Sequence, residues 1–385
     1  MNFSVSLMME IIKSEICNTP IDKSLFEKLS DDDISALYKV SSAHDLVHLV
    51  GYVLDKHKLI ANDKYLSEFR KQTYLSVYRY ENLNYEYNRI CDLLAKHNVP
   101  FITLKGTVIR KYYPEPWMRT SSDIDLYIKA ENSEQICSAI IDELGYREGD
   151  TAQNEKILYS PSNVILELHF AYDSNNNTET EVLQDAWSFT EEFELNNDGF
   201  SISNEYFYLH NIVHMAKHFE EGGCGVRPLI DVYLLDKYMK YDSVKLNDLC
   251  TKYGVADFFK WIKKLAGVWF DNEEHTELTH NMEDYILRGG VYGHTHSKTI
   301  VKQIRHGGKL PYMITKIWKP YSELIKQYPS LHGKKWLMPI YQMRRWGRLI
   351  FCGGAKKDIE VLGLNKNYSK AERCIKKMLS ELGLK

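Results

Sequence analysis

The sequence predicts an α+β protein in which a small mixed β-sheet core is flanked by helical regions on both sides along the chain. Apolar residues recur at three- and four-residue steps before residue 99 and again from about residue 204, a spacing typical of helices. Between these stretches, short β-rich runs alternate with turn-forming residues. We therefore divide the chain into an N-terminal helical region (1–98), an α/β core (99–200) and a C-terminal helical region (201–385).

The composition is that of a globular protein. The chain has 385 residues, of which 44% are hydrophobic and 26% charged, and its net charge is −3. This composition argues against a disordered, collagenous or coiled-coil chain. No run of eighteen apolar residues is present, which argues against a transmembrane segment, and the N-terminus carries Glu10 and no basic start, which argues against a secretory signal. The seven cysteines form no CxxC pair, as expected for reduced thiols, so we expect a cytoplasmic protein.

Each region has elements that can be placed from its pattern. In the first region we expect helices over 34–38, 44–57 and 65–97, with a core-facing stripe of Tyr74, Val77, Tyr78, Leu83, Tyr87, Ile90 and Leu94. In the core we expect strands at 99–105, 123–129, 156–159 and 164–170, and helices at 107–113 and 133–144, the latter stopped by Gly145. In the last region the clearest helices are 206–220, 229–239 and 257–269.

Positive charge is concentrated near the C-terminal end. Residues 298–350 hold twelve lysines and arginines and one acid, Glu323, for a net charge of +11, with seven tryptophans and tyrosines among them. A basic, aromatic segment attracts polyanions or an anionic membrane surface. The alternative is a solvated helical face that balances an acidic remainder.

Two aspartates on one strand carry the chemical argument. Successive strand side chains point to opposite faces, so Asp123 and Asp125 share a face. Paired carboxylates repel each other unless a divalent cation, usually Mg²⁺, takes oxygen ligands from both. Glu167 lies between leucines in the last expected strand, where a carboxylate is costly without a metal or a partner. If the two strands are neighbours, three carboxylates meet at one place, as two-metal phosphoryl transfer requires.

A glycine turn supplies the complementary half of such a site. Lys105-Gly106-Thr107 lies between an expected strand and an expected helix. Glycine allows close approach of a phosphate to the backbone, and the Thr107 hydroxyl offers a hydrogen bond. Arg119, just before the aspartates, is placed to hold the same phosphates.

The ordered set of these motifs resembles a known superfamily. Leu104-Lys-Gly-Thr107, Arg119-Thr-Ser-Ser-Asp-Ile-Asp-Leu126 and Leu166-Glu-Leu-His169 together are similar to the nucleotidyltransferases with the DNA polymerase β-type fold. More narrowly, they resemble an uncharacterised bacterial nucleotidyltransferase group with "LKG" and "DIDL" motifs and helical flanks. The resemblance covers about residues 95–235. Two departures are the lysine before the glycine, where many members have a second glycine, and a longer gap from Gly106 to Asp123.

The resemblance implies roles for particular residues. Asp123, Asp125 and Glu167 would be the catalytic carboxylates that ligate Mg²⁺ or Mn²⁺, with Glu167 helping to deprotonate the acceptor hydroxyl. The NTP phosphates would be bound by Lys105, Gly106, Thr107, Arg119 and Ser122. Possible substrate contacts, from motif positions shared with the narrower group, are His169, His214, His218, Arg227 and Asp231.

The histidines of the C-terminal region allow several interpretations. His210, His214 and His218 are four residues apart and share a helix face, without the HExxH arrangement of a zinc helix. They form a polar seam of helix packing, contact nucleotide or acceptor, or bind a metal. Arg227 and Asp231, one turn apart, either pair with each other or contact substrate.

Two functions from different classes follow. The first is an Mg²⁺-dependent enzyme that moves a nucleoside monophosphate from an NTP to a hydroxyl or phosphate of a small molecule, sugar intermediate or protein, releasing pyrophosphate. The second is a non-catalytic or regulatory nucleotide-binding module, for example a toxin–antitoxin or defence component, whose basic 298–350 segment binds a polyanion.

Overall fold

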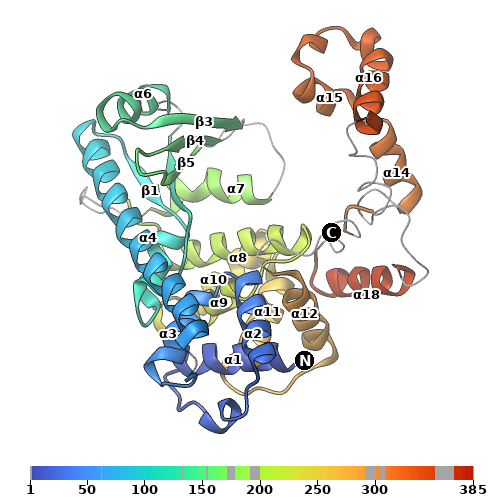
Figure 1. Cartoon of the computed structure of the whole chain (residues 1–385). Helices are drawn as coiled ribbons and strands as arrows, with labels where there is room; N and C mark the ends of the chain where they lie inside the picture. Colours follow the sequence, from blue (N-terminus) through green and yellow to red (C-terminus); the bar gives the residue numbers. More distant parts are fainter. Residues whose placement is uncertain are drawn as a thin grey trace.

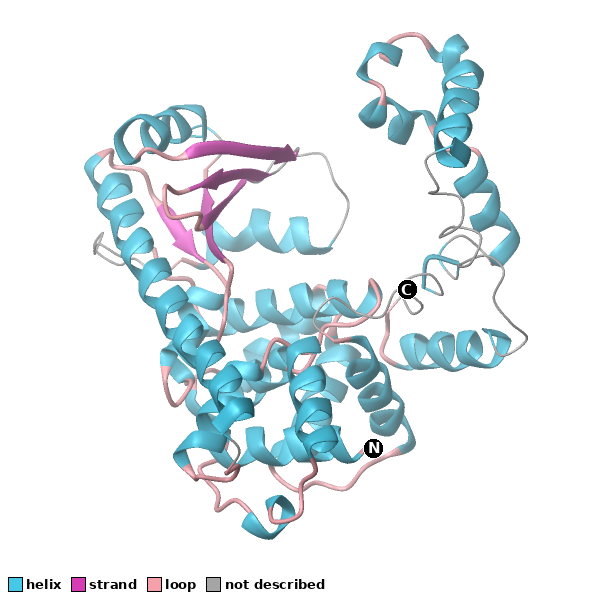
Figure 2. Cartoon of the chain, in the orientation of Figure 1, coloured by secondary structure: helices cyan, strands magenta, loops and turns pink. Residues whose placement is uncertain are grey.

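The computed structural model shows a mixed α+β protein with one five-stranded sheet beside a large body of helices (Figures 1 and 2). This is the predicted fold class. The structure describes residues 2–61, 63–129, 131, 133–152, 155–170, 178–190, 200–290, 301–303, 305, 308–351 and 368–384. Within this part of the chain, no helix combines the length and apolar character needed to cross a membrane.

Four helices precede the sheet: α1 (Phe3–Ile16), α2 (Asp31–Ala43), α3 (Val47–Lys56) and α4 (Asp63–Lys96). A capping box between Ser30 and Asp33 fixes the start of α2, because each side chain bonds the other's backbone N–H. The 34-residue α4 runs from the helical body up to the sheet (Figure 1). Its expected core stripe is partly wrong: Leu83, Ile90 and Leu94 are buried, but Tyr74 and Tyr78 are exposed. The step of five residues from Tyr78 to Leu83 is not a helical repeat, so the two tyrosines lie on a different face of α4.

The sheet has the strand order β1-β2-β5-β4-β3. Its strands are β1 (Phe101–Thr103), β2 (Asp123–Ile128), β3 (Arg147–Ala152), β4 (Glu155–Tyr159) and β5 (Ile165–Phe170). β2 and β5 are parallel and central, whereas the other pairs are antiparallel. β3 was not expected from the sequence, since Arg-Glu-Gly-Asp-Thr-Ala has no apolar alternation; it is held as an edge strand by pairing with β4.

The two faces of the sheet have different neighbours. α4 and α6 (Ser133–Leu144) cover one face in a core that includes Ile124, Leu126 and Leu166. On the other face lie α7 (Thr178–Asp185) and then α8 (Asn204–Glu220), as Figure 1 shows. The short α5 (Gly106–Ile109) and the 3₁₀ turns η2 (Arg110–Tyr112) and η3 (Pro116–Met118) connect β1 to β2.

The helices after the sheet share a core with those before it. α9 (Arg227–Tyr238), α10 (Ser243–Lys252), α11 (Ala256–Phe270) and α12 (Glu277–Gly289) pack with α1 to α3 in one apolar cluster. Beyond them, α14 (Lys309–Ile317), α15 (Tyr321–Gln327) and α16 (Met338–Phe351) extend away from the body, and α18 (Tyr368–Glu381) lies near α12 (Figure 1).

Candidate active site

Three carboxylates lie on the face of the sheet that is turned toward α7 and α8. In the parallel pairing of β2 and β5, Asp125 is directly opposite Glu167, and Asp123 is opposite Ile165. Residues opposite each other in register share a face, so Asp123, Asp125 and Glu167 belong to one surface. The structure thus brings together the two acidic segments of the sequence.

Asp125 is the centre of this surface. It is 3% exposed, and its Oδ1 accepts hydrogen bonds from Lys105 Nζ at 2.6 Å and from His169 Nε2 at 3.0 Å. Burial opposes ionisation of Asp125, but the adjacent Lys105 and His169 more than offset it and hold the pKa of this carboxyl well below its usual range. Asp125 is therefore an anion in the folded protein.

Glu167 has the opposite electrostatic environment. Burial and the nearby carboxylates of Asp125 and Asp123 raise the pKa of Glu167 to about 8. His169 Nε2 is 3.8 Å from Glu167 Oε2, and ligand atoms of Asp125, Glu167 and His169 all lie within 4.8 Å of one another. A divalent cation fits this donor set, because it would supply the positive charge that Glu167 lacks and accept carboxylate oxygens.

The turn after β1 has a strained backbone at Lys105. Its φ is +48° and its ψ −123°, a conformation that favours glycine. A glycine would adopt this geometry without strain. In this chain the lysine side chain instead delivers its ammonium group to Asp125, at 2.6 Å.

The strain at Lys105 leads to a stability prediction. Lys105→Met and Lys105→Gly both remove the ammonium group, but only glycine relaxes the backbone. We expect Lys105→Gly to be more stable than Lys105→Met by about 1 kcal/mol. Urea unfolding of the two variants measures this difference. Equal stabilities, or a more stable methionine variant, would contradict a strained turn.

Arg119 leaves no space for a side chain at Gly106. A Cβ at residue 106 would overlap Arg119 Nη1 and lie 3.2 Å from Ser121 Oγ. Ser121, which the sequence analysis did not single out, donates a hydrogen bond to Asp123 Oδ1 at 2.7 Å, whereas the expected phosphate ligand Ser122 is exposed. Because α5 has only four residues, its helix dipole is weak. The Lys105-Gly106 turn, and not the helix dipole, is therefore the feature that faces the site.

Arg119 is held from the C-terminal region. Its Nε and Nη2 donate to the two oxygens of Asp231 at 2.8 and 2.7 Å, and Tyr113 Oη also donates to Asp231 at 2.7 Å. Asp231 thus pairs with Arg119 and not with Arg227 in the described structure. Arg227 Nη1 bonds the Thr120 carbonyl oxygen at 2.8 Å and lies 3.7 Å from Asp45. Both members of the expected 227–231 pair therefore hold the loop before β2.

The histidines of α8 form a hydrogen-bonded chain with α7. Glu179 Oε1 is 2.8 Å from His214 Nδ1, and His214 Nε2 is 3.0 Å from His218 Nε2. Lys217 also donates to Glu179, at 2.5 Å. Burial opposes ionisation of Glu179, but His214 and Lys217 lower its pKa. Glu179 was missed by the sequence analysis, because an acid in the first turn of a helix has no distinguishing pattern.

His210 gives a pH prediction. It is 3% exposed, its Nδ1 has no hydrogen-bond partner in the described structure, and burial together with the charges of Lys105 and His214 lowers its pKa to about 3. Glu179 and His169 are the other charged or titratable groups that act on it. Below about pH 6.5 the imidazole of His210 binds a proton in the unfolded chain but not in the folded protein. The free energy of unfolding is therefore highest above pH 6.5 and decreases as the pH is lowered below that value.

The expected slope for this one group is up to about 1.4 kcal/mol per pH unit between pH 6.5 and about 3. His210→Phe should remove that contribution. Urea unfolding of both proteins from pH 7.5 to 4.5 isolates it as a difference between the two curves. Parallel curves would show that His210 does not titrate in this way.

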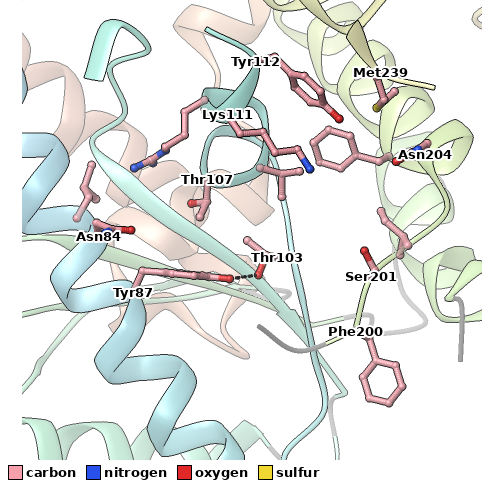
Figure 3. Close-up of a pocket in the computed structure, with 15 residues that line it drawn as sticks. Asn84, Tyr87, Thr103, Thr107, Lys111, Tyr112, Phe200, Ser201, Asn204 and Met239 are labelled. Carbon is pink, nitrogen blue, oxygen red and sulfur yellow. Dashed lines mark hydrogen bonds between the residues drawn. The ribbon is translucent and has the colours of Figure 1, made fainter. Parts of the chain in front are cut away.

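Thr107 lies apart from the carboxylates. Its side chain lines a cavity together with Thr103 of β1 and Tyr87 of α4, whose hydroxyl group is 2.8 Å from Thr103 Oγ1 (Figure 3). Thr103 is paired with Leu126, which faces α4. The structure therefore places this cavity beside β1 and not over the carboxylate face.

Comparison with known proteins identifies the class of the chain. Residues 30–271 match the family model described as uncharacterised nucleotidyltransferase, and the protein belongs to this family. The solution structure of the antibiotic-resistance factor ANT(2'')-Ia is 13% identical, with a TM-score of 0.34 over 46% of this chain and 92% of that one. A CCA-adding enzyme in complex with CTP is 10% identical, with a TM-score of 0.23 over 79% of this chain and 84% of that one. Both likenesses are weak, so the assignment rests on the family match. No curated protein sequence matches the chain.

Proposed function

We propose that this nucleotidyltransferase moves a nucleoside monophosphate from an NTP to a hydroxyl or phosphate acceptor with release of pyrophosphate, and that it depends on Mg²⁺ or Mn²⁺. The observation that carries the proposal is the direct pairing of Asp125 with Glu167 on parallel strands, with Asp123 on the same face. Together with the family match, it supports a phosphate-handling site on this face of the sheet.

In this proposal the cation is held by Asp123, Asp125 and Glu167. When bound, it neutralises phosphate charge and favours departure of pyrophosphate. Glu167 is then ionised and accepts the proton of the acceptor hydroxyl. The acceptor oxygen forms a bond to the α-phosphorus as the bond from that phosphorus to the pyrophosphate oxygen breaks. Lys105 Nζ lies 2.6 Å from Asp125 Oδ1, and in this proposal it turns from that carboxylate to the phosphates.

The remaining residues position the substrates. Asp231 binds Nε and Nη2 of Arg119, which leaves Nη1 beside Gly106, where the NTP phosphates would lie. The α8 histidines lie within electrostatic reach of Lys105, which supports a place for the acceptor beside His214 and His218. We therefore propose that the region 201–385 supplies the acceptor site.

The test is a screen of the four NTPs against small-molecule, sugar and protein acceptors, read by intact mass and pyrophosphate release with Mg²⁺ or EDTA. Product that requires both the NTP and the cation supports the proposal. Stabilisation of the protein by an NTP without any pyrophosphate release in the full screen would contradict it.

A second function is favoured by the extended helices near the C-terminus. Six large apolar side chains on or beside α14 and α16 are 43–76% exposed, namely Ile314, Ile317, Trp318, Trp336, Ile340 and Met343. Lys334, Lys335, Arg344 and Arg348 are exposed among them, while Lys298 lies outside the described residues. This surface supports a regulatory module that binds a polyanion or an anionic membrane surface.

The polyanion interpretation gives a salt-dependence prediction. Lys334→Glu/Lys335→Glu should weaken binding of a fluorescent single-stranded oligonucleotide and lower the slope of log affinity against log salt by about 1.4, since each contact to a single strand contributes about 0.7. Fluorescence anisotropy at several salt concentrations measures the slope. Lys39→Glu/Lys245→Glu, on exposed or partly exposed positions of α2 and α10, is the charge-matched control. Equal slopes for all three proteins would contradict a polyanion site here.

A further inference from the structure

A cavity of about 440 Å³ lies at the edge of the sheet beside β1, the edge strand that pairs with β2. Figure 3 shows Asn84 and Tyr87 on one side, Asn204 and Met239 on the other, and Thr107 and Lys111 between them. These residues come from α4, α5, η2, the start of α8 and the position directly after α9. The volume is in the range of small-molecule sites, about 300–1,000 Å³.

The charge of the cavity lining is positive. Arg110 and Lys111 are its charged residues, and none of its fifteen lining residues, all within the described chain, is acidic. Amide and hydroxyl groups, including those of Asn84 and Ser201, add hydrogen-bonding capacity, and the rings of Tyr87 and Tyr112 add flat apolar surface. An anionic ligand with a planar or apolar part matches this lining.

Arg110 provides the second, independent observation. It is 7% exposed, yet its Nη2 has no hydrogen-bond partner and no carboxylate lies within ion-pair distance of it in the described structure. Its Nε donates to the Gly106 carbonyl oxygen at 3.3 Å, and its guanidinium lies 5.5 Å from the centre of the Tyr80 ring. Burial and the charge of Arg119 lower the pKa of Arg110 to about 10, although the carboxylate of Asp123, beyond ion-pair distance, acts in the opposite direction.

The contrast with Arg119 shows what is missing. Both arginines are buried beside Gly106, but Arg119 makes two charge-assisted hydrogen bonds to Asp231. A buried guanidinium without an anion is unfavourable, and no residue that lines the cavity supplies one. A ligand anion in the cavity would complete the hydrogen bonding of Arg110 as Asp231 completes that of Arg119.

We propose that this cavity is a binding site for a small organic anion, a phosphate or carboxylate attached to a planar or apolar group, with Arg110 as its charge partner. The lining of the cavity contains none of the three carboxylates, and the proposal does not depend on nucleotide transfer, although Arg110 is near enough to Asp123 to feel its charge. Arg110 is four residues after Gly106 and donates to its carbonyl, so the ligand would contact the same short connection that bears the glycine turn.

The test uses phenyl phosphate and benzoate as probes, with the full chain in EDTA and without NTP. Isothermal titration calorimetry should detect binding of at least one probe to the unmodified protein. Arg110→Met keeps an apolar stem of similar length and should weaken that binding by tenfold or more. Asn84→Trp changes an exposed residue at the edge of the cavity and should block it; Asn84 belongs to α4, on the opposite face of the sheet from Asp125.

The control is Arg288→Met, which removes an arginine of α12 whose side chain is 76% exposed and should leave binding unchanged. Preference for phenyl phosphate assigns a phosphate ligand, and preference for benzoate assigns a carboxylate ligand. Lack of binding of both probes at millimolar concentration overturns the proposal, and so does equal binding by the unmodified protein and Asn84→Trp. Because no NTP is present, these outcomes are independent of those that test nucleotide transfer.

Discussion

Asp125→Asn is expected to reduce nucleotide transfer by about 10²–10³-fold or more, since it removes a charged ligand at the centre of the acidic face. Asp125 is 3% exposed and accepts from both Lys105 and His169, so the substitution removes the carboxylate that these two groups share. The measurement is pyrophosphate release at saturating NTP and Mg²⁺, with circular dichroism and urea unfolding to confirm the folded state.

A double variant separates lost chemistry from lost stability. Asp125→Asn leaves Lys105 without its ion-pair partner at 2.6 Å, which is destabilising in a buried place. Asp125→Asn/Lys105→Gly removes the stranded charge and the strained backbone together, so it should be more stable than the single variant while remaining inactive. Near-normal turnover in either purified protein would rule out a catalytic role for Asp125.

The sequence was sufficient for the local part of this site. Alternation along 123–128 places Asp123 and Asp125 on one face, and the costly position of Glu167 among leucines identifies the second acidic strand. The bounds of α6, including its stop at Gly145 with φ of +74°, also follow from periodicity and a glycine signal. These features depend only on residues close together in the chain.

The rest of the site depends on contacts between distant residues. Arg119 and Asp231 are 112 residues apart, and His214 and Glu179 are 35 apart. No pattern in either segment specifies its partner. The error over Tyr74 and Tyr78 has a local cause, since the five-residue step from Tyr78 to Leu83 places the two tyrosines on a different face of α4 from Leu83. The sequence also did not show that the N-terminal and C-terminal helices share one core, because their contacts join residues far apart in the chain.

The largest expected effect on stability comes from Asp231→Asn. This change breaks the bidentate ion pair with Arg119, and it weakens the hydrogen bond that Tyr113 donates. The side chains of Arg119 and Asp231 are each only 9% exposed. Removing one partner of a buried ion pair typically costs about 3–5 kcal/mol, because the other charge remains buried. Urea unfolding is expected to show a loss of this size.

The matched comparison is Arg119→Met/Asp231→Leu, which replaces both charges by apolar groups of similar volume. Such replacements are often neutral, but the buried Tyr113 hydroxyl loses its acceptor here, so part of the stability should return. If Arg119 holds NTP phosphates at Gly106, however, the restored protein will remain defective in NTP binding, and NTP will no longer raise its melting temperature. A double variant that recovers both stability and NTP binding would make Arg119 a structural residue only. The pair thus separates the structural role of Asp231 from the substrate role of its partner, which neither single substitution can do.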